Sequence, residues 1–132
     1  MTRNPPAVEP RGVILLIDDD ASVLRYLTRT LENVGYGVRT ANNGRDGLEA
    51  YRNERADLVI TDLFMEQQEG LETIRMLRAL DPKAMIIAMT GGSLSFPGDY
   101  LGMAMKLGAA ATMVKPFDRE TVLRTVQDLL SL

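Results

Sequence analysis

The sequence contains no cysteine and no histidine. Without cysteine it can form no disulfide, zinc-thiolate site or thiol nucleophile, a composition that fits a reducing cytoplasm. Without histidine, imidazole metal sites, Ser-His-Asp chemistry and acid-base catalysis by histidine are excluded. Any reaction at this protein must therefore use carboxylates, hydroxyls, lysine and a bound ion.

A strong charge and long apolar runs are lacking as well. The net charge of −3 and the pI near 5.0 argue against a nucleic-acid-binding surface. No apolar run is long enough to span a bilayer, and the N-terminus lacks the apolar segment of a signal peptide. We therefore expect a cytoplasmic protein with neither a nucleic acid nor a membrane as its partner.

The chain is long enough for one domain, since 132 residues with 45% hydrophobic side chains can form a core without disulfides or metals. Residues 1–11 hold three prolines and no periodicity, so we expect a flexible tail followed by a single domain over residues 12–132. In that domain short apolar runs alternate with helical patterns five times. The expected strands are residues 13–17, 37–41, 58–61, 85–89 and 110–114.

Five strand-helix units with helix-length crossovers predict an α/β fold. The connections require a parallel sheet, and right-handed crossovers place helices on both of its faces. Four of the five expected strands are continuous apolar runs, which is typical of a doubly covered sheet. The sequence therefore predicts a three-layer, doubly wound domain with five parallel strands.

Polar residues stand where the expected strands end. The first strand is followed by Asp18 and Asp19, the third by Asp62, the fourth by Thr90 and the fifth by Lys115. The carboxyl ends of parallel strands meet at one edge of the sheet, so these side chains should gather there. Three carboxylates in one cleft repel each other, and a hard divalent cation such as Mg²⁺ relieves that repulsion.

These residue types together describe a phosphoryl-transfer site, where catalysis depends mostly on positioning and charge neutralisation. The carboxylate of Asp62 is the candidate nucleophile, Lys115 supplies a positive charge and Thr90 supplies a hydroxyl donor. We expect Asp20 to cap the following helix instead of binding the ion.

At these motifs the chain resembles the CheY-like receiver domain of two-component response regulators, from about Val13 to the C-terminus. The family's acidic pair matches Asp18 and Asp19 in ILLIDDD, and its phospho-accepting aspartate matches Asp62 in DLVITDLFM. Its hydroxyl residue matches Thr90 in IIAMTGG, and its lysine with the following proline matches Lys115 and Pro116 in MVKPF.

The resemblance implies a flavodoxin-like strand order of 2-1-3-4-5 and a cis peptide bond between Lys115 and Pro116. It also implies a Mg²⁺ ion held by Asp18, Asp19, Asp62 and the main-chain carbonyl of Phe64, with Asp18 acting partly through water.

The implied function is that of a stand-alone response regulator, a monomer or weak dimer. It would take a phosphoryl group onto Asp62 from a sensor histidine kinase or a histidine phosphotransfer protein and then signal to a downstream protein. Such a domain is a phosphoacceptor that assists its own phosphorylation and dephosphorylation, and it is not an enzyme in the usual sense.

Two positions depart from the family's pattern. Glu66 stands where the family usually has proline, and Thr112 stands where it has a switch aromatic on the fifth strand. Without that ring, we expect residues 91–98 to carry the conformational change. The expected readout face comprises the fourth helix, fifth strand and fifth helix, near Tyr100, Met103 and Lys106.

Two alternatives remain open at this point. A haloacid-dehalogenase-type phosphatase would use Asp18 as nucleophile and Asp20 as acid-base, but it would leave Asp62 unexplained. A receiver-like scaffold that is never phosphorylated would account for Glu66 and Thr112.

Overall fold

The computed structural model describes residues 11–63, 69–91 and 100–131, so Phe64, Glu66 and most of the predicted tail lie outside the described residues. Within these described ranges five strands and five helices alternate. They are β1 (Val13–Ile17), α1 (Ala21–Glu32), β2 (Gly37–Ala41), α2 (Gly44–Asn53), β3 (Leu58–Asp62), α3 (Glu69–Leu80), β4 (Ile86–Gly91), α4 (Tyr100–Leu107), β5 (Ala111–Lys115) and α5 (Arg119–Leu130).

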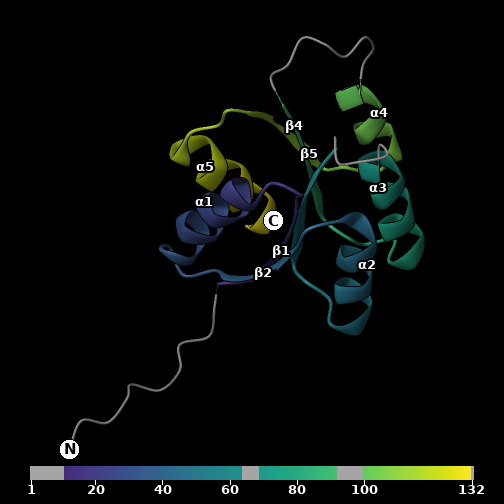
Figure 1. Ribbon diagram of the computed structural model, residues 1–132, viewed down its shortest axis with the longest axis horizontal. Helices are drawn as coiled ribbons and strands as arrows, with labels where there is room; N and C mark the ends of the chain where they lie inside the picture. The colour runs from purple at the N-terminus through teal and green to yellow at the C-terminus, as the bar shows by residue number, and fades with distance from the viewer. Residues whose placement is uncertain (1–10, 64–68, 92–99, 132) are drawn as a thin grey trace, which may run out of the picture.

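The five strands form one parallel sheet in the order β2-β1-β3-β4-β5, which confirms the predicted fold class and strand order. Helices α1 and α5 lie on one face, and α2, α3 and α4 lie on the other (Figure 1). Each face has its own core: Leu27, Leu31 and Val126 pack on one side, and Ile74 and Leu77 on the other. The central strands are therefore buried on both faces, which explains their continuous apolar sequences.

Helix caps follow the sequence signals closely. The side chain of Asp20 accepts a hydrogen bond from the backbone N–H of Ser22 and so caps α1, as predicted. Asp118 caps α5 in the same way through the N–H of Thr121. Gly35, in the turn after α1, has a φ of 100°, a conformation that glycine adopts without steric cost.

The first described residue is held by the turn between α1 and β2. The backbone N–H of Arg11 donates to the carbonyl of Gly35 at 2.9 Å, and its guanidinium donates to the carbonyl of Val34 at 3.1 Å. The same guanidinium lies 4.9 Å from the ring centroid of Tyr36. Arg11, the first of the described residues, is thus already held by contacts with the folded domain.

Two strands extend further toward the site than their apolar runs indicate. Strand β4 continues to Gly91 and β5 to Lys115, because these two residues pair with each other in the parallel ladder. Thr90 therefore lies within β4, whereas the sequence predicted that it would follow the strand. The backbone of both Thr90 and Lys115 is fixed by neighbouring strands.

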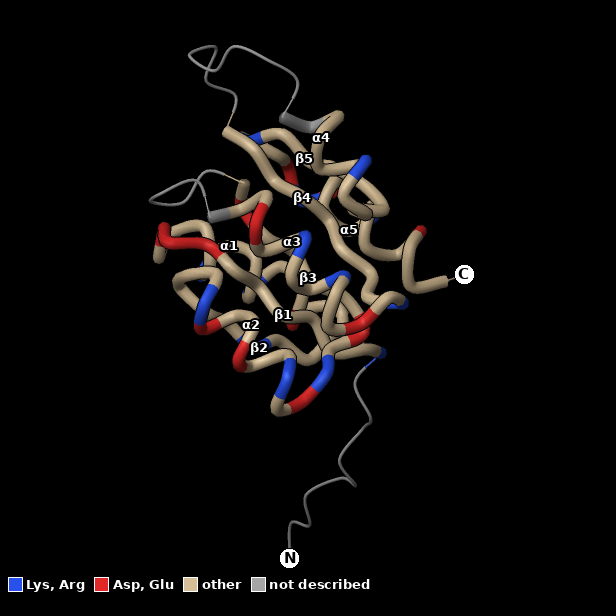
Figure 2. Tube along the Cα trace, turned by 90° about the vertical axis from the view of Figure 1, so that its right-hand side faces the viewer, with Lys and Arg blue, Asp and Glu red and all other residues tan. Residues whose placement is uncertain are grey.

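The surface carries charges of both signs. Figure 2 shows acidic and basic positions interspersed along much of the trace of the described residues. Among those residues no helix combines the length and the apolar character that crossing a membrane requires.

Candidate functional site

Three aspartates meet at the carboxyl ends of two neighbouring strands. Asp18 and Asp19 follow β1, and Asp62 is the last residue of β3. The register pairs Ile17 with Thr61, so Asp18 and Asp62 emerge side by side. One carboxylate oxygen from each of the three aspartates lies within 4.8 Å of the others. The structure thus brings together the carboxylates that the sequence places at this edge.

Asp18 is the most enclosed member of this cluster, with a side chain that is completely buried. Its Oδ2 accepts a hydrogen bond from Lys115 Nζ at 2.8 Å, and its Oδ1 accepts one from the backbone N–H of Asp20 at 2.9 Å. Burial raises the pKa of the Asp18 carboxyl, the charge of Asp62 acts in the same direction, and the two hydrogen bonds oppose them.

Lys115 provides the positive charge of the site. Its Nζ lies 2.8 Å from Asp18 Oδ2 and 3.4 Å from Asp62 Oδ2, so one ammonium bridges two carboxylates. Burial lowers the pKa of Lys115, but the hydrogen bond to Asp18 and the charges of Asp62 and Asp18 outweigh it and raise this pKa above its ordinary value. The Lys115–Pro116 peptide bond is cis, as the resemblance implies.

Thr90 lies on the same edge, one residue beyond Met89, which pairs with Asp62 across β3 and β4. Its side chain is almost buried, and its hydroxyl donates to the carbonyl of Gly91 at 3.3 Å. Within the described residues, no hydrogen bond joins this hydroxyl to the three aspartates. Thr90 is therefore near the cluster in the sheet but bonded to its own strand.

The two remaining predicted ligands are Asp19 and the main-chain carbonyl of Phe64. Asp19 is exposed and belongs to the cluster, whereas Asp20 is engaged as the cap of α1. The carbonyl of Phe64 lies outside the described residues, so its predicted role stays a prediction.

One feature beside the site was missed at the sequence level. An apolar hollow of about 490 Å³ opens next to Lys115, between α1 and the segment after β5. Tyr26, which is 40% exposed, lies with its ring centroid 6.3 Å from that of Phe117 and forms part of this hollow. Tyr26 falls off the apolar stripe of its helix, and an aromatic residue at such a position was the signal available in the sequence.

The donor set of the cluster fits a hard divalent cation. All three ligand groups are carboxylates, their oxygens lie close enough to share one ion, and a single lysine is the only cation bonded to them among the described residues. Carboxylate oxygens suit Mg²⁺, which usually binds one or two carboxylates directly and keeps several waters, so the third carboxylate would contact such an ion through water.

Comparisons with known proteins agree with this geometry. The sequence model described as "Response regulator receiver domain" matches residues 14–127. The transcriptional regulatory protein ZraR of Escherichia coli K12 is 34% identical over 118 residues, which cover 89% of this chain and 26% of that protein. The chain thus spans about a quarter of the length of ZraR and GlrR, and about half of the length of YkoG of Bacillus subtilis.

Solved structures of similar length share the fold. The chemotaxis protein CheY4 of Vibrio cholerae superposes with a TM-score of 0.80 at 28% identity, over 89% of this chain and 98% of that one. A response regulator from Thermotoga maritima superposes with a TM-score of 0.81 at 26% identity, over 95% of this chain and all of that one.

Proposed function

The chain belongs to the response regulator receiver domain family, and from this premise we propose that it accepts a phosphoryl group on Asp62. The donor is the phosphohistidine of a sensor histidine kinase or of a histidine phosphotransfer protein. The observation that carries the proposal is the position of Asp62: it ends a buried strand beside two further aspartates and lies 3.4 Å from the ammonium of Lys115.

Asp19 and Asp62 are the best candidates for direct contact with a Mg²⁺ ion. Both oxygens of Asp18 already accept hydrogen bonds from the protein, so this residue is better suited to act through a bound water. When bound, the ion would neutralise charge on the phosphoryl oxygens during transfer.

The transfer itself is a displacement at phosphorus. A carboxylate oxygen of Asp62 forms the new P–O bond, the P–N bond to the donor imidazole breaks, and its electron pair stays on the imidazole nitrogen. The product carries roughly 1.5 to 2 negative charges at neutral pH. Lys115 is placed to pair with these oxygens, and Thr90 would reach them only if its hydroxyl leaves the carbonyl of Gly91.

The apolar hollow beside Lys115 is a suitable place for the donor protein to dock, since it opens next to the reacting group. Signal output is proposed to use the face of α4, β5 and α5, where Met103 and Val114 are each 48% exposed. That the chain works alone in the cytoplasm and binds no nucleic acid stays a prediction. The relatives ZraR and GlrR are transcriptional regulatory proteins that are much longer than this chain.

The haloacid-dehalogenase alternative lacks support in the site. It requires Asp20 as an acid-base, but the side chain of Asp20 caps α1, and it leaves the position of Asp62 without a role. The scaffold alternative predicts that Asp62 is never phosphorylated, and a measurement of intact mass separates it from the present proposal. Incubation with acetyl phosphate and Mg²⁺ should add one phosphoryl group to the intact mass, and excess chelator should prevent the addition. An unchanged mass under saturating conditions would support the scaffold instead.

A further inference from the structure

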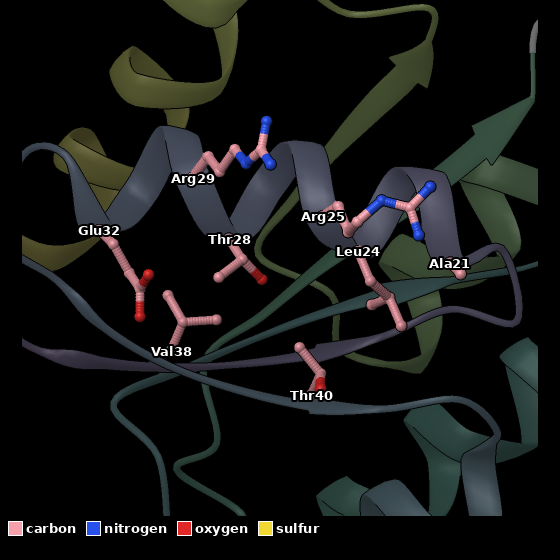
Figure 3. A pocket seen from close by; sticks show the side chains of 8 residues that line it. All are labelled: Ala21, Leu24, Arg25, Thr28, Arg29, Glu32, Val38 and Thr40. Atoms are coloured by element: carbon pink, nitrogen blue, oxygen red, sulfur yellow. The ribbon is translucent and has the colours of Figure 1, made fainter.

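A groove between α1 and β2 lies on a face that the proposed function does not use. It has a volume of about 590 Å³, and Figure 3 shows Leu24, Thr28 and Glu32 extending from α1 toward Val38 and Thr40 on β2. The guanidinium group of Arg29 points away from the strand, and that of Arg25 extends along α1 toward Ala21 (Figure 3). The groove thus combines one side of a helix with part of a strand.

β2 is an outer strand of the sheet, and within the described residues it pairs only with β1. The N–H of Gly37 donates to the carbonyl of Gly12, and the carbonyl of Ala41 accepts from the N–H of Asp18. In a parallel ladder alternate residues bond to the same neighbour, so the backbone groups of Val38 and Thr40 point away from the sheet. These two residues also line the groove.

The usual protection of a sheet edge is missing here. Edge strands are commonly guarded by proline or by charged side chains, especially lysine. The two residues of β2 whose backbone groups face outward are Val38 and Thr40, and neither side chain carries a charge. The charged residue of this strand, Arg39, is occupied elsewhere: its guanidinium donates to the carbonyls of Ala50 and Glu54 at the end of α2. Nothing in the strand's own sequence therefore opposes pairing with another strand.

Two of the three charged residues that line the groove, Arg25 and Glu32, are complementary under a two-fold axis, and the third is Arg29. Arg25 and Glu32 lie at opposite ends of the groove-lining side of α1, about one helical turn from Thr28 on either side. Neither residue has an ion-pair partner within the described part of the chain. A two-fold axis near Thr28 would place each Arg25 opposite the Glu32 of another copy.

The strand and the helix require the same symmetry axis. In Figure 3 Glu32 lies above Val38, and Leu24 lies toward Thr40, so α1 and β2 run in opposite directions. Antiparallel pairing of two β2 strands about residue 39 would place Val38 of one copy beside Thr40 of the other. The outward backbone groups of these residues could then exchange four hydrogen bonds.

We propose that this face is a self-association surface, through which two copies join their β2 edges into one continuous sheet and pack α1 against α1. The occupant of the groove is the α1 helix of the second copy. An isologous contact of this kind closes on itself and gives a dimer, not a filament. We expect a weak affinity, because each copy contributes one 5-residue strand and one side of one helix, and we expect association without Mg²⁺ or phosphorylation.

Sedimentation equilibrium of the unphosphorylated 132-residue chain tests the proposal, over a concentration range of about 10 to 500 µM. The average mass should rise from 14.6 kDa toward twice that value. Arg25→Glu or Glu32→Arg should each weaken the dimer at least about tenfold through like-charge contacts, and the double variant should restore it. Arg45→Glu, an exposed arginine on α2 away from the groove, is the matched control and should leave the dimer unchanged.

The backbone contacts have their own test. Thr40→Pro removes an outward-facing N–H without removing a bond to β1, so it should abolish the dimer while circular dichroism stays that of the wild type. The proposal is overturned if the chain stays at 14.6 kDa throughout, which would leave the groove to another kind of partner. It is overturned equally if the dimer persists unchanged in the Arg25→Glu and Glu32→Arg variants, since the contact would then lie on another face.

Discussion

Tyr51→Phe should destabilise the protein by removing one buried hydrogen bond. The hydroxyl of Tyr51 donates to Asp81 Oδ2 at 2.6 Å, and both residues are almost completely buried, between α2 and the end of α3. A hydrogen bond to a charged group is worth about 1.5 to 3 kcal/mol. Asp81 keeps two other partners, the N–H of Lys83 at 3.0 Å and the guanidinium of Arg55 at 3.6 Å, so we expect about 1.5 to 2 kcal/mol.

The loss should depend on pH at both ends of the scale. The hydrogen bond from Tyr51 lowers the pKa of Asp81 below its ordinary 3.8, so this stabilisation is present above that value and is lost as the pH falls through the lower, folded pKa. Burial and the same hydrogen bond raise the pKa of Tyr51 from 10.0 to about 12. Its contribution is therefore complete below pH 10.0 and disappears as the pH rises toward about 12.

Urea unfolding followed by circular dichroism, from about pH 3 to pH 11, measures this dependence. The difference in unfolding free energy between wild type and Tyr51→Phe should be constant near neutral pH and smaller at both extremes. Near neutral pH it should correspond to roughly 5 to 9 °C in Tm. Tyr26→Phe is the control, because Tyr26 is 40% exposed and should change stability by less than about 0.5 kcal/mol. If both variants lost the same free energy, the buried pair would not contribute as reasoned.

Four further substitutions test the site and the switch. In the absence of Mg²⁺, Lys115→Met should lower the unfolding free energy by about 2 kcal/mol or more, because it leaves the buried carboxylate of Asp18 without its cation. Urea unfolding measures this loss, and an unchanged midpoint would contradict it. Asp20→Ala should cost about 1 kcal/mol as a lost cap but keep Mg²⁺ affinity by calorimetry, whereas Asp19→Ala should lose that affinity. Thr112→Ala should preserve the phosphorylation-dependent change in amide hydrogen exchange of α4, whereas a side-chain switch at this position would abolish it.

The sequence predicted the fold and much of the site because both depend on local patterns. Continuous apolar runs such as residues 58–61 indicate strands buried on both faces, and parallel topology then brings the carboxyl ends of the strands together. The meeting of Asp18, Asp19 and Asp62 follows from that rule with no knowledge of side-chain positions. The cap role of Asp20 likewise depends only on its place before α1.

The rest depends on tertiary partners that no local pattern indicates. Tyr51 and Asp81 are 30 residues apart, and neither position differs from an ordinary helix or turn residue in the sequence. The same holds for Arg39, whose guanidinium crosses to the end of α2, and for the extension of β4 through Thr90. Because pairing with a neighbouring strand determines where a strand ends, an apolar run predicts that a strand exists better than it predicts the last residue of that strand.

Locating the acyl phosphate tests the central claim most directly. The chain is phosphorylated with acetyl phosphate and Mg²⁺, reduced with borohydride, which converts phosphoaspartate to homoserine, and digested for mass spectrometry. We expect homoserine at position 62, and no modification at that position in Asp62→Asn. Homoserine at Asp18 or Asp19, or phosphorylation of Asp62→Asn to the wild-type level, would contradict the assignment of Asp62 as the phosphoacceptor.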